Sequence, residues 1–434
     1  MNKIQSAQVV QLVLSDEMKT YFDQMCDYRR YIWNKALALW QDLYQAHTVF
    51  DEIYKYEFTP VTDKKTGKVK QVKEKQYHRN PLPTWQSIKA MLVEDKENWE
   101  DLRSSRSLQL ACKDLGETWS RFFDKSLVNC KMPKFKSKRE PRQGFKSDRV
   151  RIEDGKLVLD LPRALKRYLK DNSLDWWQSL KTTEPLKMVK AQTVSFFKEK
   201  NKYYAAIAYQ KETAAKPKTG KVNGVDLNTS HYNDIAGVHY LLSKRLLYCY
   251  HEIANCQRRL ARKRKVNGLR KAQRSNSYVK TRNKLNYWYE RAKHIQKDWL
   301  QKYTNQLIDN YDMIVIEDLN VNAMKMGIAS KSVHRAMFGM FRQILSYKCK
   351  WYDKELIIAD KWYPSTQRCA NCGFVKTGED KITLYGNKKH KTKHNEHICY
   401  NCDYQNDRDV NAMLNLIYLA VDDETMKQLV KENS

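Results

Sequence analysis

Long apolar runs are missing from this sequence, and glycine and proline are few. No stretch approaches the 18 continuous apolar residues that indicate a transmembrane helix, which argues against a membrane-spanning protein. The first 18 residues lack the profile of a signal peptide. The 434 residues include only 13 glycines and 9 prolines. We also see no internal repeat, and no low-complexity tract outside the lysine-rich loops. We therefore expect a soluble, intracellular protein of two to four domains.

Acidic residues are in short supply relative to basic ones. The chain has 80 lysines and arginines against 50 aspartates and glutamates, a formal net charge of +30. An excess of this size predicts a polyanionic partner, and nucleic acid fits better than a membrane surface. Residues 258–274, "RRLARKRKVNGLRKAQR", contain nine basic residues and no acid, whereas a solvated helix normally mixes the two signs. "KMPKFKSKR" (131–139) and "KHKTKH" (389–394) are smaller patches of the same kind.

Cysteine is too scattered to predict disulfides. Six of the ten cysteines stand alone, and the other four form two CxxC pairs, Cys369/Cys372 and Cys399/Cys402. Two such pairs place four thiolates around one structural Zn²⁺, in a closed site with no open position for catalysis. The segment between the pairs also carries His390, His394 and His397, which are weaker candidates for a substituted ligand.

The pattern of apolar residues divides the chain. A strand is expected at 7–14, and helical spacing follows, with Ile32, Ala36, Leu39, Trp40 and Leu43 on one face. Residues 59–83 are polar and broken by proline, which predicts a loop or insertion. Short alternating runs indicate β structure from about 129, including a hairpin at 194–212. After a linker at 213–221, strands at "NGVDL", "DMIVIEDL" and "ELIIAD" and helices over 242–309, 334–354 and 406 onward indicate an α/β region.

Three carboxylates stand at the ends of these elements. Asp226 ends the strand "GVDL", Glu317 ends "MIVIE", and Asp409 lies at a helix start in "DRDVNAMLN". If the strands are neighbours, the three side chains can converge, and such hard oxygen ligands suit Mg²⁺. Each also has a structural interpretation, since Glu317 with Asp318 can close a strand and Asp407 or Asp409 can cap a helix.

The set "GVDL … IVIEDLNV … CANCG … CYNC … DRDVNAMLN" resembles the RuvC-like nuclease of the TnpB family, transposon-encoded RNA-guided DNA endonucleases whose core is shared with miniature type V CRISPR effectors. "YRRYIWNKALALW", "MPKFKSKR" and "KNKYYAAIAYQKE" resemble the family's N-terminal helix and wedge motifs. The resemblance implies Asp226, Glu317 and Asp409 as catalytic ligands of two Mg²⁺ ions, with Mn²⁺ as an alternative and Asp407 as the fallback for Asp409. It also implies a guide RNA that base-pairs with target DNA, and a short adjacent motif read by the protein.

The implied architecture is multidomain α+β: an N-terminal helical lobe, a β-barrel-like wedge domain, and an RNase H/RuvC-like α/β nuclease domain with an inserted four-cysteine zinc ribbon. The expected boundaries are 1–14 for the first wedge strand, 15–128 for the helical recognition domain, 129–213 for the wedge, 222–361 and 406–434 for the nuclease, and 362–405 for the zinc ribbon. One departure stands out. The family usually has a glycine after "D-L", then a second strand and a turn, whereas Asn228 and the short segment after it predict a shortened sheet edge.

The expected nucleic-acid contacts are Arg258, Arg259, Arg262, Lys263, Arg264, Lys265, Arg270, Lys271, Lys134, Lys136 and Lys138. The expected partners are the guide RNA and target DNA, with the protein acting as a monomer in a prokaryotic cytoplasm beside the nucleoid. Two alternatives remain close: a miniature type V CRISPR effector with the same chemistry, and a nuclease-silent RNA-guided repressor. A guide-free DNA-binding or transposition accessory protein is a third.

Overall fold

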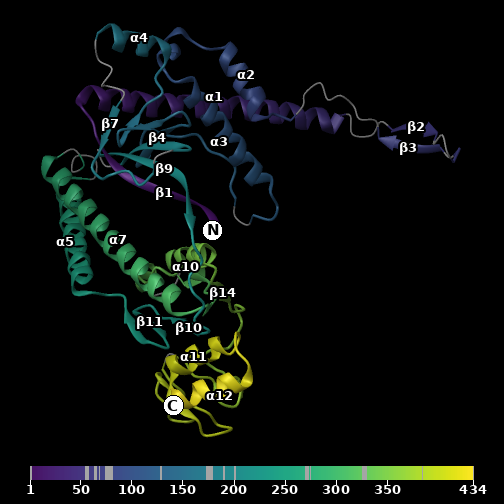
Figure 1. Ribbon diagram of the computed structural model, residues 1–434, viewed down its shortest axis with the longest axis vertical. Helices are drawn as coiled ribbons and strands as arrows, with labels where there is room; N and C mark the ends of the chain where they lie inside the picture. The colour runs from purple at the N-terminus through teal and green to yellow at the C-terminus, as the bar shows by residue number, and fades with distance from the viewer. Residues whose placement is uncertain are drawn as a thin grey trace. The chain divides into compact units, whose positions relative to one another are not determined.

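The structure, a computed structural model, forms two compact units: residues 3–211, and residues 212–434 together with the first two residues. It describes residues 2–53, 58–62, 66–67, 69–73, 82–127, 130–172, 179–188, 191–199, 202–268, 273, 275–324, 330–383 and 385–433. Both units combine helices with β-sheet, as Figure 1 shows. The expectation of a multidomain α/β protein is confirmed. Within the described residues, no helix is both long and apolar enough to cross a membrane.

The helices of the first unit pack around aromatic side chains. They are α1 (Asp16–Ile53), α2 (Trp85–Glu94), α3 (Ser105–Phe123) and α4 (Arg163–Asp171), with the 3-10 helix η1 (Asn98–Leu102). The face of α1 that the spacing predicts is the buried one, since Ile32, Ala36 and Trp40 lie in the core against α2 and α3. Trp40 stacks on Trp119 with ring centroids 5.8 Å apart.

The first unit also contains a seven-stranded sheet. Its order is β4-β8-β9-β1-β7-β6-β5, with β1 (Asn2–Val13), β4 (Arg142–Ser147), β5 (Arg151–Glu153), β6 (Lys156–Val158), β7 (Ser179–Thr182), β8 (Val194–Glu199) and β9 (Lys202–Thr213). The antiparallel pair β8–β9 is the hairpin expected at 194–212. The expected barrel is not closed: β4 and β5 are the two edges, and no pairing joins them within the described residues.

The insertion at 59–83 was expected to be a loop, and in its described parts that expectation is wrong. β2 (Phe58–Thr62) and β3 (Val69–Lys73) pair antiparallel along their whole lengths. Each strand has only five residues, "FTPVT" and "VKQVK", and neither alternates strictly between polar and apolar, so periodicity gives no strand signal here. The hairpin adds only two strands of its own and joins neither larger sheet.

The second unit is built on a mixed five-stranded sheet in the order β12-β11-β10-β13-β14. Its strands are β10 (Val222–Leu227), β11 (His231–Asp234), β12 (Gly237–Tyr240), β13 (Met313–Ile316) and β14 (Glu355–Ile358). β10, β13 and β14 are parallel, so their carboxyl ends meet at one edge of the sheet. Parallel strands are covered on both faces, which explains why β13, "MIVI", is a continuous apolar run and why nearly every residue of β10 is buried.

The short segment after Asp226 still forms two strands of four residues each. β11 pairs antiparallel with β10, with Asp226 opposite Asn233, and β12 pairs with β11. Gly237, with φ of 118°, begins β12 and makes the tight turn between β11 and β12. A backbone turn this compact needs few residues, so the short segment still supplies both strands.

The second unit also contains helices. They are α5 (Lys244–Asn267), α7 (Asn276–Asn310), α8 (Val321–Met324), α9 (Ser330–Ala336), α10 (Phe338–Tyr352), α11 (Arg408–Ile417) and α12 (Asp423–Glu432). α5 and α7 lie side by side in Figure 1. Tyr232, Tyr303 and Phe341 are buried together in the core between sheet and helices. The single helix expected at 334–354 is divided, because Met337 takes a left-handed conformation between α9 and α10.

Gly224 explains how α11 comes close to the central strand. A Cβ atom at this position would lie 2.6 Å from the backbone oxygen of Met413 in α11. Real Cβ atoms do not approach a carbonyl oxygen that closely, so only glycine permits this contact. The contact brings the first turn of α11, which carries Asp409, toward β10, which carries Asp226.

Candidate active site and metal centre

Asp226 and Glu317 lie at the carboxyl-terminal edge of the parallel strands. Asp226 is the penultimate residue of β10 and is 5% exposed, and Glu317 directly follows β13. Because β10 and β13 pair in parallel with Val225 opposite Ile316, the two carboxylates leave the sheet at the same level. Glu317 is held by the hydroxyl of Ser365, which donates to Oε1 at 2.5 Å.

Of the two aspartates at the start of α11, only Asp409 faces this edge. Asp407 is the N-cap of the helix, and its Oδ1 accepts the backbone N–H of Asp409 at 2.8 Å. Asp409 is therefore free of the capping task, and its Oδ2 accepts from His231 Nε2 at 3.1 Å. The guanidinium of Arg408 lies 3.6 Å from its other oxygen. This arrangement separates the two interpretations that the sequence left open.

Asn228 joins the first and third carboxylates. Its amide Nδ2 donates to Asp226 Oδ2 at 2.9 Å and to Asp409 Oδ2 at 3.0 Å. The sequence marks Asn228 only as a departure from a family pattern, and His231 carries no signal of its own. Asn228 and His231 reach the carboxylates because β11 folds back and pairs with β10. The periodicity of residues along one strand gives no information about which strand pairs with it. The amide thus stands between two carboxylates that would otherwise repel each other.

Burial and neighbouring negative charges disfavour ionisation of Asp226 and Glu317. Burial raises the pKa of Asp226 well above its usual value, and the neighbouring charges of Glu317 and Asp409 raise it further, against the lowering effect of Asn228 and Arg408. Burial and Asp409 also raise the pKa of Glu317, while Ser365 lowers it. Like charges gathered in a buried site are stabilised by a cation between them. The donors are hard oxygens, as Mg²⁺ requires, so the residues fit such an ion.

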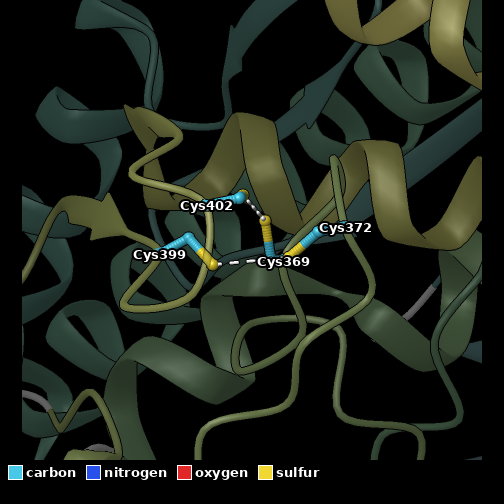
Figure 2. A group of neighbouring side chains, drawn as sticks. All are labelled: Cys369, Cys372, Cys399 and Cys402. Carbon is cyan, nitrogen blue, oxygen red and sulfur yellow. Dashed lines mark hydrogen bonds between the residues drawn. The ribbon is translucent and has the colours of Figure 1, made fainter.

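The four cysteines of the CxxC pairs come together in the second unit. Their sulfur atoms all lie within 4.8 Å of one another, with Cys369 3.8 Å from Cys402 and Cys372 3.5 Å from Cys399 (Figure 2). A tetrahedral Zn²⁺ with Zn–S bonds of about 2.3 Å needs sulfurs about 3.8 Å apart. No histidine joins this group in the described part of the chain, so His390, His394 and His397 are not needed as ligands.

Two equivalent turns build this cluster. The N–H of Cys369 donates to Phe374 and that of Gly373 donates back to Cys369, while Cys399, Tyr404 and Asp403 repeat the same pattern. Gly373 and Asp403 hold the left-handed conformation that each turn requires. The second turn lies between β15 (Glu396–Ile398) and β16 (Gln405–Asp407). Burial raises the pKa of the Cys369 and Cys399 thiols, so a metal ion would release protons when it binds.

Helix α11 connects the cysteine cluster to the carboxylates. Asn411 accepts the N–H of Ala370 and donates to the carbonyl of Arg368, and Asn415 donates to the carbonyls of Arg368 and Ser365. Both asparagines are fully buried. Their spacing of four residues in "NAMLN" places them on one face of the helix and was a readable signal that the sequence reasoning did not use. The same helix therefore positions Asp409 directly and Glu317 through Ser365.

Comparison with known proteins finds matches along much of the chain. Three family models match: a "Helix-turn-helix domain" over residues 1–48, a "Probable transposase" over 206–326 and a "Cas12f1-like, TNB domain" over 338–416. A Streptomyces pristinaespiralis protein, provisionally named RNA-guided DNA endonuclease, is 27% identical over 72% of this chain and 71% of its own length. InsQ of Escherichia coli K12, provisionally named in the same way, is 26% identical over 74% and 75%. "TnpB-like protein L79" of Acanthamoeba polyphaga mimivirus is 26% identical over 36% and 31%.

The chain is thus similar to TnpB-like proteins and to proteins named RNA-guided DNA endonuclease. A solved Cas12f1–sgRNA–target DNA complex aligns over 96% of this chain and 99% of the solved one, with 10% sequence identity and a TM-score of 0.46.

The basic residues that the sequence singles out on α5 have different surroundings. Lys263 donates to Ser277 and Thr281 of α7, and the guanidinium of Arg264 donates to the hydroxyl of Tyr278. These two side chains hold the helices together. The other predicted contacts on α5 are exposed, namely Arg258, Arg259, Arg262 and Lys265, while Arg270 and Lys271 lie outside the described residues.

The lysines of "MPKFKSKR" lie against α1 in the first unit. Backbone groups of Lys136 pair with the side chain of Asn34 at 2.8 and 3.0 Å, and the carbonyl of Lys134 accepts the indole N–H of Trp33. The Lys136 ammonium lies 3.8 Å from the Trp33 ring centroid, and burial lowers its pKa to about 8. Lys134 and Lys138 are exposed, and Lys138 pairs with Asp27 at 3.3 Å.

Proposed function

We propose that this chain is an RNA-guided, Mg²⁺-dependent DNA endonuclease of the TnpB kind. The observation that carries the proposal is the convergence of Asp226, Glu317 and Asp409 from β10, β13 and the start of α11. The raised pKa values of Asp226 and Glu317, with the Asp409 carboxylate beside them, favour a cation site over a purely structural role. The names of the curated relatives support the activity, and the net charge of +30 supports the polyanionic partners.

The fold of the second unit supports a RuvC-like nuclease domain. An antiparallel hairpin continues into parallel strands, and the acids stand on the central strand, on its parallel neighbour and on a helix that crosses the sheet. We assign residues 222–361 and 406–434 to this domain, 362–405 to an inserted zinc ribbon, 15–128 to the helical recognition domain, and 1–14 with 129–213 to the wedge. Zinc in the ribbon is structural in this proposal, because four cysteines leave no open position.

The protein's own groups have distinct tasks at the site. Bound in pairs, Mg²⁺ ions would activate a water and stabilise the leaving oxygen of a phosphodiester. Asp226, from the central strand, would hold such ions together with Glu317 and Asp409. Ser365 orients Glu317, and His231 with Arg408 orients Asp409. The Asn228 amide donates to both Asp226 and Asp409 and would compete with a cation for those oxygens.

Nucleic acid would be held by charge and by base pairing. A guide RNA pairs with one DNA strand, and the protein grips the heteroduplex by its backbone and reads only a short adjacent motif. The exposed cations of α5, with Lys134 and Lys138, are the proposed phosphate contacts. The protein is proposed to act as a monomer on one guide.

The test is cleavage by the protein purified with the RNA that accompanies it. Asp226→Ala, Glu317→Ala and Asp409→Ala should each abolish cleavage while RNA remains bound. Asp407→Asn is the matched control, because asparagine still caps α11 and should leave cleavage intact. Full cleavage by the Asp226 and Glu317 variants would overturn the proposal.

A miniature type V CRISPR effector is the second candidate, favoured by the family model matched over 338–416. The origin of the co-purified RNA separates the two, since a transposon end and a CRISPR repeat differ in sequence. A nuclease-silent repressor is the third candidate, favoured by the Asn228 amide between two of the acids. Guided binding of target DNA without nicking in Mg²⁺ or Mn²⁺ would establish it.

A further inference from the structure

Residues 359–365 form a short segment whose two ends both return to Glu317. At the first end, the N–H of Ala359 donates to the carbonyl of Ile316 at 2.9 Å, directly before Glu317. At the second end, the hydroxyl of Ser365 donates to the Glu317 carboxylate at 2.5 Å. Trp362 is the middle residue, three positions from each end. At about 3.5 Å of chain per residue, its Cα lies within roughly 10 Å of both contacts.

The backbone on both sides of Trp362 is fixed. Its own N–H donates to the Asp360 carboxylate at 2.8 Å, and the N–H of Tyr363 donates to the Asp360 carbonyl at 3.0 Å. The hydroxyl of Tyr363 donates to the carbonyl of Asn415 in α11 at 2.8 Å, and Asn415 donates to the carbonyl of Ser365 at 2.8 Å. These hydrogen bonds hold the segment to the site at several points, so the backbone fixes the position of Trp362.

The indole of Trp362 nevertheless projects into solvent. It is 81% exposed, more than any other tryptophan among the described residues. Tryptophan buries more apolar surface than other residues when it packs, so an indole held in water beside a polar site needs a reason. The ammonium of Lys361 lies 4.9 Å from the ring centroid, which adds a positive charge at the same point. An exposed aromatic face with an adjacent cation is how proteins bind single-stranded nucleic acid without reading its sequence.

We propose that Trp362 is a positioning residue that stacks on one base of single-stranded DNA and so holds the neighbouring phosphodiester at the Asp226–Glu317–Asp409 site. Lys361 pairs with a phosphate of the same nucleotide. This inference rests on the proposed function, because it names the substrate form that the site receives: an unpaired strand, whose bases are free to leave the stack. A base inside a duplex cannot present its face to the indole.

The test is binding of a single-stranded DNA oligonucleotide that carries 2-aminopurine, measured by fluorescence on full-length protein in the Asp226→Ala background. Binding is measured in a variant that is expected not to cleave DNA, so the result tests stacking whether or not the parent protein is a nuclease. The titration is made at raised salt, where contacts to phosphate weaken and stacking persists. Trp362→Ala should weaken binding roughly 5- to 150-fold, the range for loss of one stacked base. It should also restore 2-aminopurine fluorescence that stacking quenches.

The control variants separate stacking from a structural role. Trp362→Phe should recover most of the affinity and Trp362→Leu should not, since leucine supplies apolar surface without an aromatic face. Tyr385→Ala removes another exposed aromatic, 88% exposed, in the same unit, and should bind like the parent protein. Equal affinity of Trp362→Ala and its parent, or full recovery by leucine, would overturn the proposal. When Asp226 is intact, Trp362→Ala should raise KM more than it lowers kcat. The nuclease proposal is tested separately, by whether the parent protein cleaves DNA.

Discussion

Replacing Asp226 with asparagine should stabilise the metal-free protein while it removes the proposed activity. Asp226 and Asp409 accept from the same Asn228 nitrogen at 2.9 and 3.0 Å, so those oxygens lie no more than about 6 Å apart. Two unit charges at that separation repel by about 3 kcal/mol at an effective dielectric constant near 20. Asparagine removes the repulsion and weakens one hydrogen bond by about 1 kcal/mol, because its amide oxygen is not charged. The net gain is about 2 kcal/mol.

The assay is thermal unfolding of parent and Asp226→Asn after dialysis without Mg²⁺. For a unit of about 220 residues, 2 kcal/mol corresponds to a Tm increase of roughly 4–8 °C at pH 7. When Mg²⁺ is added, the parent should have the higher Tm, because the cation stabilises the parent site and the variant has one carboxylate fewer to bind it. Asp318→Asn is the matched control: this carboxylate is half-exposed beside Arg342, and its removal should not raise Tm.

The pH dependence gives the sharper check. Because folding raises the pKa of Asp226 and Glu317, the folded state holds protons that the unfolded state releases. Metal-free stability should therefore fall as pH rises from about 4, the unfolded value, toward the raised folded value. The advantage of Asp226→Asn should be absent at pH 4 and grow through that window. A variant that is less stable than the parent at pH 7 without Mg²⁺ would refute the reasoning.

Three other outcomes are expected. Cys372→Ser should lower the zinc content measured by atomic absorption and destabilise the second unit, whereas serine at Cys130, which is exposed and outside the cluster, should do neither. Gly224→Ala should cost roughly 1–3 kcal/mol in denaturant unfolding, because its Cβ would displace the Met413 carbonyl; unchanged stability would contradict the close approach of α11. Joint replacement of Arg259 and Arg262 by glutamine should make the plot of log binding constant against log salt concentration for RNA less steep, by an amount that corresponds to about one to two phosphate contacts. The melting temperature, as the control, should not change.

Sequence pattern alone determined the elements that depend on neighbours in the chain. The strand before Glu317 was predictable because a buried parallel strand is a continuous apolar run, as in "MIVI", and "GVDL" is a shorter run interrupted only by Asp226. The cysteine cluster was predictable because each CxxC pair makes its own local turn. The face of α1 that packs was predictable from helical spacing, since Ile32, Ala36 and Trp40 recur at that period.

Only the tertiary structure decided which of several suitable groups meet. Asp407 and Asp409 are equally acidic and two residues apart, and the direction of α11 makes one a cap and turns the other to the site. Lys263 is as basic as Arg262, yet the packing of α5 on α7 uses only the former. Asn228 reaches two carboxylates from opposite ends of the unit because a hairpin and a helix converge there. Such contacts depend on pairing across long separations in sequence, and periodicity along one segment carries no information about them.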